Sequence, residues 1–209
     1  MVRIDSARVP LIDARHRVRA TRESGAQTRG TLLDAAWRLF EVRGFAAVSL
    51  GAIAAAADCF PSQITYYFGT KDALFAEAAC REIVRLAERI EEVGAQARSP
   101  QSYSRAMATE APASPALPAF CETLLIARRN PDVQQLVSAT LEQLRQEGAR
   151  AIEELWSRKG WRLTTPPQAI SRVMWATALG LALEQAGTGI PIDPVAAESA
   201  IAAALGSDR

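Results

Sequence analysis

Apolar side chains recur at helical spacing along most of the chain, and this pattern predicts helices. Between Thr28 and Arg43, the apolar positions 32, 36, 39 and 40 follow one face of a 3.6-residue period. From Lys71 to about Ala97, a longer stripe of the same kind predicts one long helix. Alanine is abundant and aromatic residues make up only 6% of the chain, which favours packed helices over sheets. We therefore predict an all-α fold of about nine helices.

The second half of the chain carries clear helix boundaries. Asn130 precedes Pro131 as a cap, and Gly160 follows the helix that these residues begin. Another helix is predicted from Pro166-Pro167 to about Ala186, and the last from Asp193 to Leu205. Residues 99–118 hold several prolines with Ser, Thr and Ala between them. We expect a loop there, with one short helix around residues 103–109 and another starting at Pro115 or Pro118.

Residues 173–183 are apolar on nearly every face of their predicted helix. A helix of this kind has to be buried on more than one side. That burial is hard to achieve in a two-layer bundle of one chain, and an exposed apolar face would promote aggregation. A second copy of the chain would cover it, so the pattern indicates a dimer.

The stretch from Ser49 to Leu74 predicts two short helices with a tight turn between them. Ser49 is placed to cap the first helix, and Asp58 tolerates the left-handed conformation of the turn. Pro61 suits the first turn of the second helix, in which Ile64 and Phe68 share a face that packs inward. The remaining faces carry an amide, hydroxyls and phenols that suit bases and phosphates. Gly69 is expected to end this second helix and Thr70 to cap the next one. Lys71 is expected to reach a phosphate.

This arrangement resembles a DNA-binding helix-turn-helix. Ile53-Ala54 and the run Tyr67-Phe68, followed by Lys71 to Leu74, are similar to the signature of the TetR/AcrR family of bacterial transcription regulators. The resemblance extends over about 45 residues, from Thr28 to Phe75. Three positions depart from the family pattern. Asp58 replaces a glycine, Phe60 replaces a Ser or Thr cap unless Ser62 takes over that role, and Thr65 replaces a tyrosine.

The resemblance implies a basic, flexible arm (1–27), a helix-turn-helix domain (28–72) and a ligand-binding and dimerisation domain (73–209). Its partners would be a double-stranded DNA operator, a second copy of the chain and an unidentified small-molecule effector, with repression the usual outcome in the family. The candidate DNA contacts are Ser49, Ser62, Gln63, Thr65, Tyr66, Tyr67 and Lys71. The candidate effector contacts are Tyr103, Met107, Phe120, Cys121, Leu124, Trp156 and Trp175. The candidate dimer contacts are Val173, Ala176, Leu179, Leu183, Ile201 and Leu205.

Charge is distributed unevenly along the chain, whose net charge is only +1. Residues 1–75 carry +3 and residues 76–209 carry −2, which suits a DNA module joined to a different one. Six arginines lie within the predicted arm, at positions 3, 8, 15, 17, 19 and 22. This arm either reaches phosphates and a minor groove or is a solvated tail.

Catalytic and metal-binding patterns are missing from the sequence. It has no phosphate-binding glycine loop and no HExxH, and its single histidine, His16, lies in the arm. We expect no enzyme activity, no cofactor, no metal site and no membrane span, and we expect a cytoplasmic location. Two alternatives remain open: a helical small-molecule carrier without DNA readout, and a redox sensor using Cys80 and Cys121.

Overall fold

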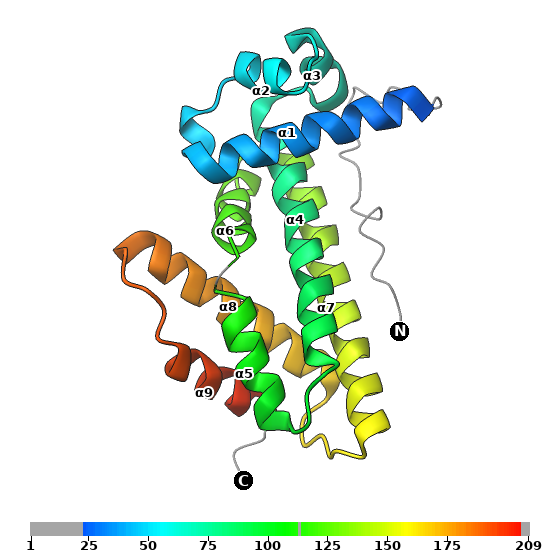
Figure 1. Cartoon of the computed structure of the whole chain (residues 1–209), viewed down its shortest axis with the longest axis vertical. Coiled ribbons are helices and arrows are strands. Elements are labelled where there is room, and N and C mark those ends of the chain that lie inside the picture. Colours follow the sequence, from blue (N-terminus) through cyan, green and yellow to red (C-terminus); the bar gives the residue numbers. More distant parts are fainter. Residues whose placement is uncertain (1–22, 113, 206–209) are drawn as a thin grey trace. The chain divides into compact units, whose positions relative to one another are not determined.

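The computed structural model describes residues 23–112 and 114–205, and these residues form nine α-helices without strands (Figure 1). The predicted all-α fold is confirmed. The helices are α1 (Glu23–Ala47), α2 (Leu50–Ala56), α3 (Pro61–Phe68), α4 (Lys71–Gly94), α5 (Pro100–Glu110), α6 (Ala116–Ala127), α7 (Pro131–Lys159), α8 (Pro167–Thr188) and α9 (Pro194–Leu205). None of these nine helices combines the length and the hydropathy needed to cross a membrane.

The contacts divide the described residues into two compact units. The first, called the head unit here, contains residues 23–82 and 122–139, and the second, the body unit, contains 83–112, 114–121 and 140–205. The sequence placed the domain boundary after Asp72, at the start of α4. This boundary stays a prediction; the division into compact units falls inside α4, after Glu82, and the helix continues through it.

The head unit is built around α1, which packs on α2, while α2 packs on α3. The predicted start of the first helix at Thr28 is wrong, because α1 begins at Glu23 and includes Thr28 in its interior. The apolar stripe behaves as expected: Leu32 and Ala36 are fully buried, and the ring of Phe40 packs edge-on against that of Phe75 at 5.1 Å. Gly44 has a φ of 75°, which breaks the helical conformation where the sequence predicts its end.

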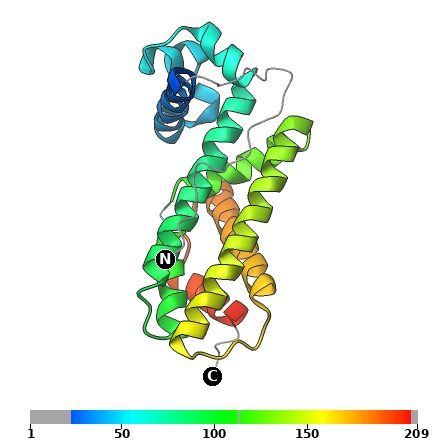
Figure 2. The same cartoon turned by 90° about the vertical axis from the view of Figure 1, so that its right-hand side faces the viewer.

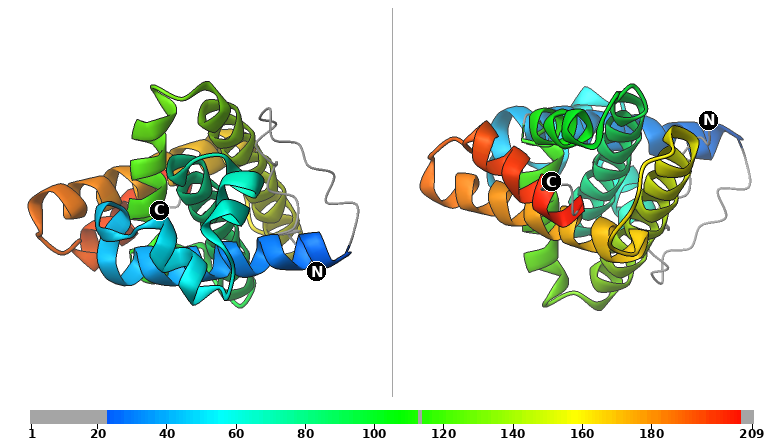
Figure 3. Two further views of the ribbon diagram at one scale, coloured as in Figure 1. Left: turned by 90° about the horizontal axis from the view of Figure 1, so that it is seen from above. Right: turned by 90° about the horizontal axis from the view of Figure 1, so that it is seen from below.

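The body unit contains one helix whose full length the sequence pattern does not predict. Residues 100–110 form α5, where a loop with a shorter helix was predicted. Ser99 caps this helix through a reciprocal pair of bonds with Ser102, at 3.1 and 2.9 Å. Tyr103 and Met107 lie on its buried face. Helix α5 packs on α9, which also packs on α8 (Figure 3, right).

Helices α7 and α8 lie side by side in the body unit (Figure 2). The indole Nε1–H of Trp175 on α8 donates a hydrogen bond to the backbone oxygen of Leu144 on α7, at 3.3 Å. As predicted, Asn130 caps α7 by accepting from the N–H groups of residues 132 and 133, and Gly160, with a φ of 69°, follows its end. The core of this unit contains Trp156, whose ring packs edge-on against those of Tyr103 and Trp161.

Candidate nucleic-acid interface and candidate effector cavity

The turn between α2 and α3 has the geometry that the sequence predicts. The Ser49 side chain caps α2 by accepting a hydrogen bond from the N–H of Ala52, at 3.1 Å. Asp58 adopts a φ of 51° and is the one non-glycine residue in the described ranges with a positive φ. The backbone N–H of Cys59 then reaches back to the oxygen of Ala54, at 2.9 Å, which closes the turn. Pro61 is the first residue of α3, as expected.

Helix α3 has one buried face and one exposed face. Ile64 and Phe68 are 0% and 5% exposed and anchor the helix to the rest of the head unit. The candidate contacts lie on the other faces, where Ser62, Thr65 and Tyr66 are exposed while Gln63 and Tyr67 are half-buried. The rings of Tyr66 and Tyr67 pack edge-on at 5.1 Å, so the two phenols form one aromatic surface. The exposed face therefore offers hydroxyls, an amide and aromatic edges together.

The start of α3 is capped by Gln63 and not by Ser62. The side-chain oxygen of Gln63 accepts a hydrogen bond from the N–H of Phe60, at 3.0 Å. A glutamine three residues after the cap position is the sequence signal for this bond. The Phe60 side chain forms no capping hydrogen bond. It is 76% exposed, so an apolar ring is in contact with solvent at the beginning of α3.

The end of α3 leads directly into α4. Gly69 has a φ of 74° and ends α3, and the Thr70 hydroxyl accepts from the N–H of Ala73 at 3.1 Å. Both roles are as predicted. The ammonium of Lys71 lies 4.4 Å from the centre of the Phe45 ring. This cation–π contact holds the single lysine of the candidate set at the start of α4.

Arg29 connects three helices of the head unit and was not foreseen from the sequence. Its guanidinium forms an ion pair with both carboxylate oxygens of Glu77 on α4. The same group lies 4.8 Å from the centre of the Phe68 ring on α3. Burial raises the pKa of Glu77, and the adjacent Arg29 opposes that rise. Arg29 thus fixes α3 and α4 against α1, which makes it a positioning residue for the exposed face of α3.

Positive charge in the N-terminal part of the chain is concentrated in residues 1–22, which lie outside the described residues. They carry six arginines and two aspartates, a net charge of +4. Residues 23–82 carry five Lys or Arg and seven Asp or Glu, a net charge of −2. The described face of α3 therefore supplies groups for recognition but little of the charge that attracts DNA.

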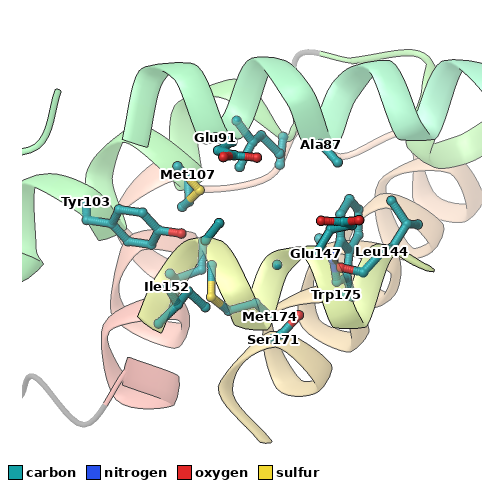
Figure 4. Close-up of a pocket in the computed structure, with 16 residues that line it drawn as sticks. Ala87, Glu91, Tyr103, Met107, Leu144, Glu147, Ile152, Ser171, Met174 and Trp175 are labelled. Atoms are coloured by element: carbon teal, nitrogen blue, oxygen red, sulfur yellow. Dashed lines mark hydrogen bonds between the residues drawn. The ribbon is translucent and has the colours of Figure 1, made fainter. Parts of the chain in front are cut away.

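The body unit contains a cavity between α4, α5, α7 and α8 (Figure 4). The space between protein atoms at this site is about 640 Å³, part of which is open solvent. Its lining is mainly apolar, with a few polar groups from all four of these helices. The residues that line it include Glu91, Tyr103, Met107, Glu147, Gly148, Ser171, Met174 and Trp175.

The structure brings together three of the seven candidate effector residues. Tyr103, Met107 and Trp175 line the cavity. The other four do not: Phe120 and Trp156 are buried in the core, Cys121 is buried, and Leu124 lies half-buried in the head unit. The sequence did not indicate Glu91, Glu147, Ser171 or Met174, because their positions on separate helices carry no shared motif.

The carboxylates at the cavity differ in their partners. Glu147 forms an ion pair with Arg150, one turn further along α7. The Glu91 carboxylate makes no hydrogen bond or ion pair with any residue in the described ranges, and Arg150 acts on it only as a nearby charge. Burial raises its pKa, Arg150 opposes this, and Glu154 and Glu147 add to it. Burial, followed by the charge of Glu91, also raises the pKa of Tyr103 well above its usual value, so the phenol stays protonated.

The thiols do not have the environment of a redox sensor. Cys80 is fully buried, and burial raises the pKa of the Cys121 thiol. The Cys121 thiol donates a weak hydrogen bond to the backbone oxygen of Leu179, at 3.4 Å. A reactive thiol needs a lowered pKa and access to solvent; Cys80 lacks the access, and Cys121 has a raised pKa. The described residues also contain no group of three or more side chains suited to a metal ion.

The six candidate dimer residues fall into two sets. Ile201 and Leu205 are 6% and 2% exposed and belong to the core of the single chain. Val173 and Leu183 are 47% and 54% exposed, although both are large and apolar. The four residues that reach the surface all lie on α8, and they are Val173, Ala176, Leu179 and Leu183.

Family models match both parts of the chain. Residues 32–78 match the model described as "Bacterial regulatory proteins, tetR family", and residues 100–203 match the one described as "Bacterial transcriptional repressor C-terminal". The chain belongs to the TetR family. The resemblance drawn from Ile53 to Leu74 is thereby confirmed. As a TetR-family protein the chain is a transcriptional regulator and not an enzyme.

Solved structures with the same fold include other regulators. A protein from Rhodococcus sp. RHA1, proposed to be a transcriptional regulator, has 29% identity and a TM-score of 0.76, covering 85% of this chain and 94% of its own. A TetR regulator from Haloarcula marismortui ATCC 43049 has 16% identity and a TM-score of 0.66, covering 87% and 98%. A proposed regulator from Saccharomonospora viridis, in complex with choline, has 16% identity and a TM-score of 0.63, covering 88% and 97%. No curated protein matches the sequence.

Proposed function

We propose that this TetR-family regulator is a repressor that binds a palindromic operator as a homodimer and releases it when a small molecule occupies the cavity. The observation that carries the proposal is the split character of α3. Ile64 and Phe68 fix one face in the head unit, while Ser62, Thr65 and Tyr66 project from the other. A helix held in this way is suited to the major groove. Its target lies on the chromosome, so we propose that the protein acts in the cytoplasm.

Within the interface we assign two kinds of contact. Ser49, Tyr67 and Lys71 surround the ends of the two short helices and would position the protein on phosphates. Ser62, Gln63, Thr65 and Tyr66 would face base edges. The exposed Phe60 ring adds an apolar group that suits a thymine methyl.

The dimer is proposed to form through α8. Val173 and Leu183 leave large apolar surface on this helix, with the small residues Ala176 and Gly180 exposed between them. Small residues let a second helix approach closely, and the large ones would then be buried. A Leu183→Glu variant should sediment as a monomer, whereas Val42→Glu, which changes an 81% exposed residue on α1, should remain a dimer.

The effector is proposed to act through α4. This one helix contributes Glu91 to the cavity and Glu77 to the ion pair with Arg29. A ligand that favours one position of α4 would shift the population of head units able to hold DNA. The choline complex of the Saccharomonospora viridis protein supports small-molecule binding in a protein of this fold.

The test is DNA binding by fluorescence anisotropy, using the duplex upstream of the protein's own gene at several salt concentrations. We expect salt-dependent binding that Lys71→Ala weakens about tenfold for every sequence tested, because a phosphate contact is lost. Lys159→Ala, on an exposed residue at the end of α7, is the matched control and should have no effect. Absence of binding even in dilute buffer would overturn the proposal.

A further inference from the structure

At the cavity in the body unit, Glu91, Glu147 and Glu154 share one cation, Arg150, so negative charge is in excess among the described residues. We infer that the effector of this cavity is an apolar monocation, a hydrocarbon or aromatic body carrying one amine or quaternary ammonium group. This inference rests on the proposed function, in which the cavity receives the effector, and it adds the chemical class of that effector.

The charge count at the cavity comes from its lining and from one ion pair. Glu91 and Glu147 both line the cavity, and no Lys, Arg or His stands among its described lining residues. The Glu147 carboxylate is paired with the guanidinium of Arg150, so its charge is already balanced. The Glu91 carboxylate has no hydrogen bond or ion pair within the described part of the chain, and the cation nearest to it in effect, Arg150, is the one already paired with Glu147. One unbalanced negative charge remains, and it faces the cavity (Figure 4).

The Glu91 carboxylate is half-buried, so its ionised form has lost part of its water without gaining a directly bonded partner, and this carries a cost. A ligand cation beside Glu91 would remove this cost, whereas an anionic ligand would increase it. A hydrated divalent metal ion does not fit, since such ions need six or more oxygen ligands and the lining is predominantly apolar. The cavity therefore favours a cation that brings its own apolar surface.

The walls supply groups that suit such a body. Trp175 and Tyr103 present aromatic rings, and Met107 and Met174 present flexible thioethers. The Trp175 ring is held in place because its Nε1–H donates to the backbone oxygen of Leu144. Aromatic faces attract ammonium groups, and methionine adapts to irregular apolar shapes.

One further polar group on the cavity wall has no hydrogen-bond partner among the described residues. The hydroxyl of Ser171 is buried without a hydrogen-bond partner in the described residues. It stands beside Gly148, where an added Cβ would come within 2.6 Å of the Ser171 oxygen. The glycine thus leaves room for this hydroxyl, which can accept from an N–H of the ligand or orient a polar substituent.

The experiment compares benzyltrimethylammonium with neopentylbenzene, its neutral isostere, by titration of tryptophan fluorescence in the full chain. We expect the cation to bind about tenfold or more tightly than the hydrocarbon, since only the cation can pair with Glu91. Glu91→Gln keeps the shape of the side chain and should abolish the preference. Glu92→Gln changes the exposed neighbour on the same helix and should preserve it.

Equal binding of the two probes, no binding of the cation, or a preference that persists in Glu91→Gln would overturn the inference. Operator binding is measured in parallel for the unmodified protein and both variants. Retained operator binding together with any of these results would refute only the effector class. Failure of the unmodified protein to bind the operator would instead refute the proposed function.

Discussion

The side-chain oxygen of Gln63 accepts a hydrogen bond from the backbone N–H of Phe60, at 3.0 Å. This bond engages the acceptor half of the amide in capping α3, because the backbone N–H requires an oxygen. The NH₂ half remains available on the half-buried side chain. Gln63 would then donate hydrogen bonds to acceptors on a base edge, such as guanine O6 and N7 or thymine O4. It would bind these in preference to the paired donor and acceptor of adenine.

Two substitutions at Gln63 separate capping from base recognition. Gln63→Ala should lower the free energy of unfolding by about 0.5–1 kcal/mol and also change the preferred operator sequence, because both halves of the amide are lost. Gln63→Glu keeps an acceptor for the Phe60 N–H and should leave stability nearly unchanged, while shifting the sequence preference away from guanine and thymine acceptors. Urea unfolding and a selection from randomised duplexes measure the two effects. An unchanged base preference in both variants would remove Gln63 from the recognition set.

The Arg29–Glu77 ion pair should be important for the stability of the head unit. Its side chains are only 17% and 4% exposed, so Arg29→Ala leaves the buried Glu77 carboxylate without its ion pair and with only the weaker attraction of Arg81. We expect a loss of about 3 kcal/mol in the free energy of unfolding, measured by urea denaturation. The double variant Arg29→Met with Glu77→Leu should recover most of this loss, because both members of the pair are removed together and neither is left buried without the other. Arg38→Ala, on the exposed side of α1, serves as the control. A double variant no more stable than Arg29→Ala would contradict this explanation.

The sequence predicted the helices whose ends carry chemical signals. Asn130, Gly160, Ser49 and Thr70 mark boundaries through caps or a positive φ, and the structure places all four as expected. The sequence-based prediction failed where such signals were misleading. Several prolines between residues 100 and 118 suggested a loop, but Pro100 is the first residue of α5, where its missing N–H costs nothing. Thr28 resembled a cap although it lies inside α1.

The cavity could be predicted only in part. Apolar residues such as Phe120 and Tyr103 look alike in the sequence, yet one is core and the other lines the cavity. Burial depends on which helices meet, and this is a property of tertiary packing. Glu91 and Glu147 are 56 positions apart, and each looks like a solvated residue on its own helix. Only the approach of α4 to α7 shows that both line one cavity.

DNA affinity should depend strongly on the arginines ahead of α1. Residues 1–22 carry a net charge of +4 while residues 23–82 carry −2. Each phosphate neutralised by a basic side chain contributes about −0.9 to the slope of log K against log salt. Replacing Arg15, Arg17, Arg19 and Arg22 by alanine in the full chain should therefore reduce the slope by up to about 3.6 units. Anisotropy titrations over a range of salt concentrations provide the slope. An unchanged slope would identify this segment as a solvated tail.

Gly94 permits a close approach between the end of α4 and the side chains of α5. A Cβ at this position would lie 2.7 Å from Cε2 of Tyr103 and 3.1 Å from the methyl group of Met107. The buried Trp156 ring, at 5.1 Å, restricts the Tyr103 ring on one side. Gly94→Ala should lower the free energy of unfolding by about 1–3 kcal/mol, measured by thermal or urea unfolding, despite the better helix propensity of alanine.

Gly30→Ala, where no atom lies within 4 Å of the added Cβ, should be neutral or stabilising. Equal stability of the two variants would show that the Tyr103 ring moves freely.

The affinity for a cationic ligand should fall as the pH falls. Burial raises the pKa of Glu91 above its ordinary 4.5, with Glu154 and Glu147 adding to the rise and Arg150 opposing it. Only the ionised carboxylate attracts a cation, so binding is strongest well above the raised pKa and weakens as Glu91 takes up a proton. Benzyltrimethylammonium has no titratable proton, and its dissociation constant, measured from about pH 8 to about pH 5, reports on the protein alone. In Glu91→Gln this pH dependence should disappear, whereas in Glu92→Gln it should remain. The same pH dependence in both variants would assign it to another group and contradict the role given to Glu91.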